Sequence, residues 1–183
     1  MRELIAARRP PQFLALPGLE ALPPAARSIL RGGDAVRQCA QAAAGVGFSL
    51  QACRAVTEGE RAALWLGPDE WLLIAPQAEG AALASSLEAA LAHLPHSLVD
   101  VSHRQSAYQL QSPQATSLLA AGCPLDLDES AFPIGMCTRT VLAKAEVVLW
   151  RRAQQTFHLE VARSFVAYVS RFLAEAARAS TLD

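Results

Sequence analysis

This chain of 183 residues has neither an excess of charge of one sign nor a long hydrophobic run. Its 16 basic and 17 acidic side chains nearly cancel, and both kinds are spread along the whole sequence. A nucleic-acid-binding protein needs a basic stripe and a membrane-surface protein a polybasic segment, so we expect neither partner. The apolar runs are also shorter than the roughly 20 residues of a membrane-spanning helix.

Closely spaced cysteines are missing too. The four cysteines are Cys39, Cys53, Cys123 and Cys137. None of them forms the C-x-x-C pair that is typical of metal and redox sites. We therefore expect reduced and mostly buried thiols in a cytoplasmic protein.

Glycine-rich phosphate loops are absent as well. Gly45-x-Gly47 lacks the third glycine of a dinucleotide fingerprint and leaves a predicted helix instead of entering one. Gly32-Gly33 precedes a predicted helix start, but the carboxylate of Asp34 would repel a phosphate there. Turns and helix caps explain both glycine pairs, so no cofactor-binding residue is predicted.

The first 26 residues are rich in proline and show no sustained hydrophobic period. This composition predicts an extended tail over 1–26, with ordering on a partner as the alternative. Arg8 and Arg9 precede an apolar stretch, as in a twin-arginine export signal. Prolines and Glu20 interrupt that stretch, so we expect the chain not to be exported.

The remaining residues, 27–183, have the length of one domain, with two subdomains divided near 95–100 as the alternative. Caps and apolar periodicity predict four helices: from Asp34 as N-cap to Gly45, over 80–94, from Ser112 to Gly122, and after Ser164. Strands are predicted over 27–31, 48–56, 61–66, 71–75, 97–101, 106–111, 138–143, 146–152 and 156–161.

Two segments of the sequence echo each other. RAALWLGPDEWLLIAP and EVVLWRRAQQTFHLEVA are each followed by a predicted helix, and Leu64-Trp65 lies 85 residues before Leu149-Trp150. The echo predicts two strand–strand–helix halves, with chance similarity as the alternative. The fold class that follows is α+β, with antiparallel sheets and helices packed against them.

Asp100, Ser102 and His103 stand close together in VDVSHR and suggest a catalytic triad. A triad needs its members to converge from separate segments and a nucleophile on a tight turn. No G-x-S-x-G occurs, and neighbouring side chains on a strand point to opposite faces. We therefore predict no catalytic residue here.

The other polar and aromatic candidates also have structural explanations. His93, His96, His103 and His158 lack the compact spacing of a metal site, so no metal ligand is predicted. The acids show no paired arrangement for acid–base chemistry, and the tryptophans on strands are more typical of a core. These residues are Glu70, Asp100, Asp126, Asp128, Glu129, Trp65, Trp71 and Trp150.

Longer motifs carry a resemblance. LWLGPDEWLLIAP at 64–76 is similar to the W-x-G-P-D-E-W-L-L signature of the folate-binding, aminomethyltransferase-like superfamily. GCPLDL, followed by Phe132, Gly135, Cys137 and Thr140, resembles the gamma subunit family of heterotetrameric sarcosine oxidases, as does the pattern around Arg163-Ser164-Phe165. The resemblance covers about 27–178.

The resemblance implies a non-catalytic subunit of a complex that demethylates sarcosine to glycine. Formaldehyde or a folate one-carbon product and hydrogen peroxide would be the other products. It implies alpha, beta and delta subunits as partners and places FAD, FMN, NAD, zinc and tetrahydrofolate in those subunits, with no cofactor in this chain.

Two departures from the family pattern leave alternatives open. The N-terminal segment has no matching motif, and Cys137-Thr138-Arg139-Thr140 differs from the family's usual Ala-Gln-Thr type of run. The alternatives are a stand-alone folate-binding one-carbon module and a subunit of a related amine oxidase. A hydrolase that uses Ser102 and His103 is the least supported.

Overall fold

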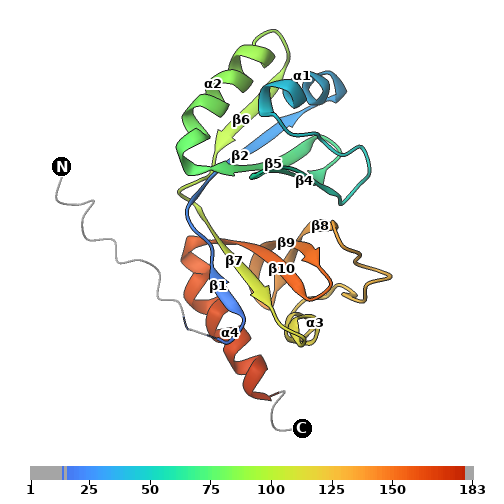
Figure 1. The fold of residues 1–183 in the computed structure, drawn as a ribbon, viewed down its shortest axis with the longest axis vertical. Helices are drawn as coiled ribbons and strands as arrows, with labels where there is room; N and C mark the ends of the chain where they lie inside the picture. The colour runs from blue at the N-terminus through green and yellow to red at the C-terminus, as the bar shows by residue number, and fades with distance from the viewer. Residues whose placement is uncertain (1–13, 15, 180–183) are drawn as a thin grey trace, which may run out of the picture.

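Two antiparallel sheets face each other in the computed structural model, and helices cover their outer faces (Figure 1). The structure describes Leu14 and residues 16–179. No helix in these residues has the length and hydrophobicity of a membrane span. The order of the layers is therefore helices, sheet, sheet, helices, which confirms the predicted α+β class.

The first sheet has the strand order β3-β4-β5-β2-β6. Helices α1 (Asp34–Ala44) and α2 (Gly80–Leu91) cover it, and a short 3-10 turn (Gln77–Glu79) leads into α2. Its strands are β2 (Ala25–Gly32), β3 (Ala55–Glu58), β4 (Arg61–Gly67), β5 (Glu70–Pro76) and β6 (His96–Asp100).

The second sheet has the strand order β1-β7-β10-β9-β8. Helices α3 (Ala115–Ala120) and α4 (Val166–Ala179) cover it, and a 3-10 turn (Arg163–Phe165) leads into α4. Its strands are β1 (Leu19–Ala21), β7 (Gln105–Gln111), β8 (Cys137–Leu142), β9 (Ala145–Ala153) and β10 (Thr156–Ala162).

The two halves repeat one topology and exchange a strand. The first half runs β1-β2-α1-β3-β4-β5-α2, and the second runs β6-β7-α3-β8-β9-β10-α4. The leading strand of each half pairs in the sheet of the other half, because β1 pairs with β7 and β6 pairs with β2. The predicted pseudo-repeat is therefore present, and each sheet is completed by the other half.

The Leu-Trp echo does not mark equivalent positions, however. Leu64 packs between the two sheets, whereas Leu149 packs under the helices of the second sheet. The tryptophans show the opposite arrangement: Trp65 packs against the cluster under α1 and α2, whereas Trp150 packs between the sheets. Successive strand residues alternate faces, so the two copies are offset by one residue.

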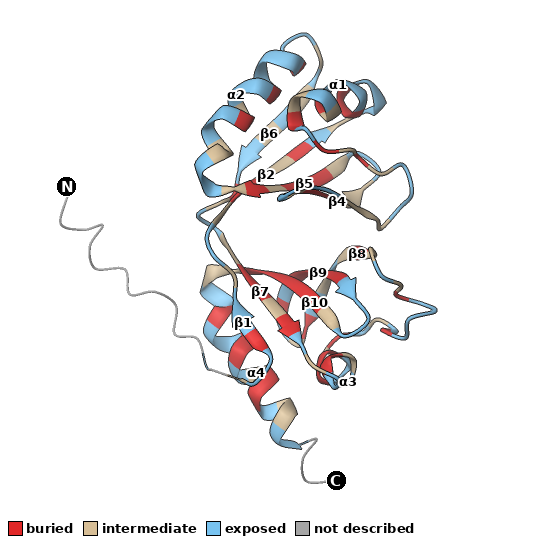
Figure 2. Cartoon of the chain, in the orientation of Figure 1, coloured by how far each residue is buried: buried red, intermediate tan, exposed pale blue. Residues whose placement is uncertain are grey.

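Three clusters of buried side chains hold these layers together. One lies under α1 and α2, where Leu83, Leu87 and Leu91 form the predicted helical stripe. A second lies under α3 and α4, and a third lies between the sheets. Figure 2 shows the buried residues concentrated on the strands, with exposed residues along the outer sides of the helices.

The Pro-rich segment is partly built into the fold. The sequence predicts a tail over 1–26, but β1 pairs with β7 and the Leu19 side chain is buried. Proline at 17, 23 and 24 flanks this short edge strand, where a missing N–H does least harm. Residues 1–13 and 15 lie outside the described residues.

Three helix starts differ from the prediction. Asp34 is the first residue of α1 and Gly33 is the N-cap, because the Asp34 carboxylate binds Arg37 one turn later, at 2.7 Å. Ser112 does not cap α3; its Oγ accepts a hydrogen bond from the Gln114 amide, and the helix begins at Ala115 with Gln114 as its N-cap. Ser164 lies in the 3-10 turn before α4.

Two other boundaries were also predicted wrongly. The strand predicted over 48–56 is Ala55–Glu58 in the structure; Phe48 is instead a core residue whose amide donates to Gln41 Oε1. Helix α2 ends at Leu91 and not at 94. The predicted end of α1 is confirmed, since Gly45 has φ 61°, a left-handed conformation that favours glycine.

We expect Leu149→Ala to lower the free energy of unfolding by about 2–5 kcal/mol, because it leaves a cavity at a position that is only 1% exposed. Leu50→Ala is the control, with an expected change within about 0.5 kcal/mol, since Leu50 is 75% exposed. Urea unfolding followed by circular dichroism measures both. Equal losses for the two variants would contradict the assigned core.

Candidate functional site

The strand exchange carries the chain between the sheets twice, and the two crossing segments lie side by side. Residues 22–24 join β1 to β2, and residues 101–104 join β6 to β7. The Val101 amide donates to the Arg27 carbonyl at 2.9 Å, and the Leu22 amide donates to the Ala107 carbonyl at 2.9 Å. We call these two segments and the inward faces of both sheets the waist.

A buried charged cluster joins the two sheets at the waist. Arg27 of β2 donates from Nε to Glu160 Oε2 of β10 at 2.6 Å, and their side chains are 3% and 0% exposed. His158 Nε2 lies 2.8 Å from the other carboxylate oxygen, Oε1. Arg27 Nη1 also donates to the Ala25 carbonyl. Both Glu160 oxygens therefore have partners, one from each sheet.

The charges of this cluster depend on one another. Burial alone would raise the pKa of Glu160, but hydrogen bonding and charge from His158, together with Arg27, hold that pKa below its ordinary value. Glu160 is therefore ionised at neutral pH. A buried ion pair gains little over an apolar pair, but losing one partner leaves an uncompensated charge inside the protein.

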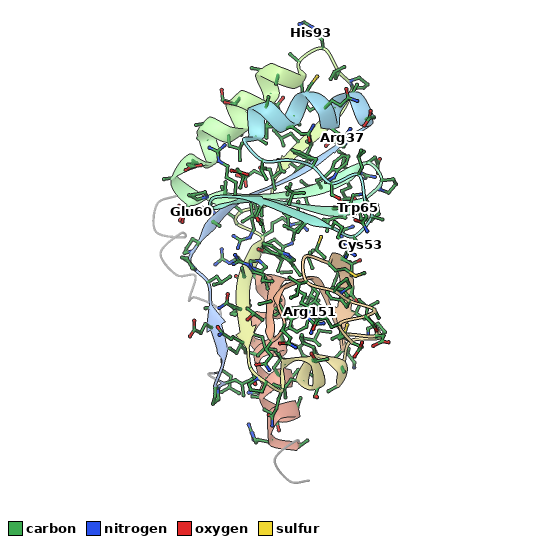
Figure 3. The ribbon with its side chains drawn as sticks, turned by 45° about the vertical axis from the view of Figure 1, so that its right-hand side comes forward. Arg37, Cys53, Glu60, Trp65, His93 and Arg151 are labelled. Atoms are coloured by element: carbon green, nitrogen blue, oxygen red, sulfur yellow. The ribbon has the colours of Figure 1, made fainter. Side chains whose placement is uncertain are left out.

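Two cavities flank the cluster and share Arg27. The larger has a volume of about 520 Å³ and is lined by both crossing segments, with His103 and Arg163 in its wall. The smaller has a volume of about 290 Å³ and lies between Trp150 and His158 of the second sheet and the β3–β4 hairpin of the first. Glu60, labelled in Figure 3, lies at that hairpin.

The three residues that suggested a triad form a turn instead. Asp100 Oδ1 accepts a hydrogen bond from the Ser102 amide at 2.8 Å, and hydrogen bonding by Ser102 lowers the pKa of Asp100. The Ser102 hydroxyl accepts from the Arg27 amide at 2.9 Å and donates to the Arg27 carbonyl. Ser102 therefore attaches the second crossing segment to β2, a structural role.

The histidines are dispersed over the structure. His96 begins β6, with Nδ1 donating to the Leu94 carbonyl at 2.9 Å, and this hydrogen bond raises the pKa of His96. His93 lies beyond the end of α2, far from the waist (Figure 3). Residues 14 and 16–179 contain no group of three or more His, Cys, Asp or Glu arranged to hold a metal ion.

The acidic candidates are engaged in local contacts. Glu70 of β5 accepts a hydrogen bond from Arg139 of β8 at 2.7 Å, which adds a second ion pair between the sheets. Asp126 accepts from the Asp128 amide, and Asp128 accepts from Ser130, so both order the loop before β8. None of these carboxylates is aimed at another acid for shared proton chemistry.

The tryptophans are core residues, and the cysteines differ in burial. Trp71 and Trp150 are buried and Trp65 is partly buried, as expected for core residues. Cys123 and Cys137 are buried, Cys53 is intermediate and Cys39 is exposed, so only half of the thiols match the expected burial. Burial raises the pKa of Cys137 to about 12, which keeps that thiol protonated.

Sequence reasoning missed two arginines. Nothing in its local pattern distinguishes Arg27, because its partner lies 133 residues away. Arg151 is also buried, and its guanidinium donates to the carbonyls of Leu127, Phe132 and Gln154 (Figure 3). Arg151 therefore holds the loop before β8 against the second sheet.

Comparison with known proteins identifies relatives by sequence. The model of the sarcosine oxidase, gamma subunit family matches residues 32–179. Sarcosine oxidase subunit gamma of Corynebacterium sp. (strain P-1) is 41% identical over 115 residues, which cover 63% of this chain and 56% of that protein. The corresponding subunit of an Arthrobacter species is 39% identical, with 69% and 62% covered. The chain thus spans less than two thirds of these relatives' lengths.

Solved structures support the same relationship. A chain of heterotetrameric sarcosine oxidase from Corynebacterium sp. U-96, in complex with pyrrole 2-carboxylate, superposes with a TM-score of 0.80 and 31% identity, over 86% of this chain and 82% of that one. Aminomethyltransferase T from Bartonella henselae superposes with a TM-score of 0.65 and 15% identity, over 85% and 45%. The second likeness shows the fold alone.

We expect Arg27→Met and Glu160→Gln each to lower the free energy of unfolding by about 3–5 kcal/mol, because each leaves one buried charge unpaired. The double variant should lose less than the sum by about 1–3 kcal/mol, because neither charge is then left without its partner and the introduced amide can still accept a hydrogen bond from His158. Urea unfolding of the four proteins measures this coupling.

The exposed pair Arg31 and Asp69 is the matched control, with side chains 55% and 53% exposed. Its coupling should be about 0–1 kcal/mol. Additive losses at Arg27 and Glu160 would show that the two charges do not depend on each other.

Proposed function

The chain belongs to the sarcosine oxidase gamma subunit family, and on that premise we propose that it is the non-catalytic gamma subunit of a heterotetrameric sarcosine oxidase. The observation that carries the proposal is the superposition on a chain of that complex, which extends over 86% of this chain. The proposed reaction of the whole complex is demethylation of sarcosine to glycine, with hydrogen peroxide and either formaldehyde or a folate one-carbon product.

The way polar groups are used at the waist supports a role without chemistry of its own. A catalytic acid or nucleophile needs a free, positioned group that can reach a substrate. Glu160 is enclosed by Arg27 and His158, and the Ser102 hydroxyl is bound to the backbone of β2. We infer that these residues maintain the shape of a subunit and that the chemistry belongs to partner chains.

We propose alpha, beta and delta subunits as those partners, with FAD, FMN, NAD, zinc and tetrahydrofolate bound in them. Several large apolar side chains are exposed in this chain and would be covered in such a complex, among them Leu50 and Ile134. The loops that carry these two residues are joined, since the Ala55 amide donates to the Gly135 carbonyl at 2.9 Å.

We further propose that 27–183, together with β1 and the start of β2, acts as one domain, because each sheet takes an edge strand from the other half. The four free thiols suit the cytoplasm, where cysteines stay reduced, and we propose that compartment for the complex.

A tagged copy of the chain, expressed in its host grown on sarcosine, should co-purify with several other chains as a yellow complex. Gel bands, flavin absorbance and sarcosine-dependent peroxide measure this outcome. Omission of this chain from co-expressed partners should lower the yield of the assembled complex, because an interface would be left uncovered. The control is the tag alone.

A yellow complex that produces no peroxide from sarcosine would keep the subunit role and change the substrate. A colourless protein recovered alone would contradict the subunit role and favour the folate-binding module. Titration of that protein with tetrahydrofolate by calorimetry would then test the alternative directly.

A further inference from the structure

Two cysteines lie across from each other where the edges of the two sheets meet. Cys53 stands just before β3 of the first sheet, and Cys137 begins β8 of the second. Next to them, Arg54 and Met136 form an isolated antiparallel bridge. The Cys137 amide donates to the Cys53 carbonyl at 3.0 Å on one side of this bridge, and the Ala55 amide donates at 2.9 Å on the other. This register places Cys53 directly opposite Cys137.

The backbone separation suits a disulfide. Opposite residues joined by such a hydrogen bond have Cα atoms about 5.5 Å apart. Disulfides join residues whose Cα atoms are about 4.4–6.8 Å apart, so this pair needs no large backbone movement. Burial is the main cause of the raised pKa of Cys137, and negative charge on Cys53 adds to it. Charges shift a pKa in this way only from nearby, which supports closeness of the two sulfurs.

Cys53 combines exposure with an unusual backbone conformation. Its φ is 57°, and within the described residues Ala143 is the only other non-glycine residue with a positive φ. This conformation costs free energy at a residue with a Cβ atom and is found most often at functional sites. Cys53 is partly exposed and Cys137 is buried, so a small oxidant in the solvent meets Cys53 first. Figure 3 shows Cys53 on the side of the first sheet that faces the second.

We propose that Cys53 and Cys137 form an oxidation site, at which hydrogen peroxide converts the two thiols into a disulfide that links the two sheets. This site goes beyond the proposed subunit function and does not depend on it. Cys53 is the thiol that reacts with the oxidant, and Cys137 is the thiol that closes the disulfide.

The reaction consumes one hydrogen peroxide and has two steps. The Cys53 thiolate attacks one peroxide oxygen, the O–O bond breaks, and the departing hydroxide takes up the proton that the thiol released. Cys53 is then a sulfenic acid. The Cys137 sulfur attacks the Cys53 sulfur, the S–O bond breaks, and the Cys137 proton leaves with the hydroxyl group as water. Two thiols are thus oxidised to one disulfide, and peroxide is reduced to two water molecules.

The disulfide would fix the two loops that carry the exposed side chains of Leu50 and Ile134. Each of these residues stands three positions before one cysteine of the pair. In the reduced chain only backbone hydrogen bonds hold the loops together at this point. Oxidation therefore restricts the movement of this apolar surface, and reduction restores it.

The test treats the full chain with hydrogen peroxide, blocks the remaining thiols with iodoacetamide and maps disulfides by mass spectrometry. We expect a disulfide between Cys53 and Cys137 that dithiothreitol reverses. Trypsin leaves Cys39 with Cys53 and Cys123 with Cys137, because no Lys or Arg lies between the members of either pair. Chymotrypsin cuts after the phenylalanine that lies between the members of each pair and so separates them.

The intermediate can be trapped in the same experiment. The raised pKa of Cys137, about 12, leaves little thiolate for the second step, so that step is the slower one. Dimedone added together with peroxide should therefore label Cys53 and reduce the yield of the disulfide. Labelling of Cys137 with none at Cys53 would contradict the proposed order of the two steps.

Cys39→Ser is the matched control, because Cys39 is exposed on α1 and should not take part. This variant should form the disulfide as the unaltered chain does. Cys53→Ser should abolish it, and because Cys53 is only partly buried this replacement should leave the fold intact. Cys137→Ser should also abolish it, with dimedone labelling of Cys53 retained. No disulfide in the unaltered chain, or equal loss in Cys39→Ser and Cys53→Ser, would overturn the proposal.

Oxidation in urea separates the effect of the native register from random encounter of the thiols. Mixed pairings among the four cysteines are expected in urea, and the single pairing of Cys53 with Cys137 without it. The same mixture under both conditions would overturn the proposal. These readouts need neither partner chains nor sarcosine, so they separate failure of this site from failure of the proposed function.

Discussion

The exchange of edge strands is the constraint on which the remaining architecture depends. Because β1 and β6 each complete the sheet of the other half, the chain must cross the waist twice. The crossings place Ser102 against Arg27 and enclose the pair that Arg27 forms with Glu160. A charged pair in this position is tolerated only because each carboxylate oxygen has a partner, so the waist must form as a whole.

This use of polar side chains connects the fold to the proposed role. The sequence suggested Asp100 and Ser102 as catalytic candidates, but both form hydrogen bonds that hold the crossing segment in place. Glu160 holds the two sheets together. Arg139 and Glu70 add a second link between the sheets, between β8 and β5. Polar side chains that bond to one another within the chain suit the proposed role of a structural subunit.

Local features of the fold could be predicted from the sequence, and contacts between distant segments could not. The stripe of Leu83, Leu87 and Leu91 and the glycine at 45 follow from helix periodicity and capping, which act over a few residues. The prediction that Phe157 and His158 lie on opposite faces of a strand is correct, but the pattern could not show that both faces of β10 are buried. The Arg27–Glu160 pair spans 133 residues, and β1 is too short for a period to mark it.

Native-state hydrogen exchange tests the interdependence of the two halves most directly. The hairpins β4–β5 and β9–β10 lie in the middle of their sheets, one in each half. If the exchanged strands and the buried pair make one cooperative unit, the slowest amides of both hairpins should report the same free energy of opening and the same dependence on denaturant. Opening of one hairpin at a clearly lower free energy, with the other still protected, would contradict the account.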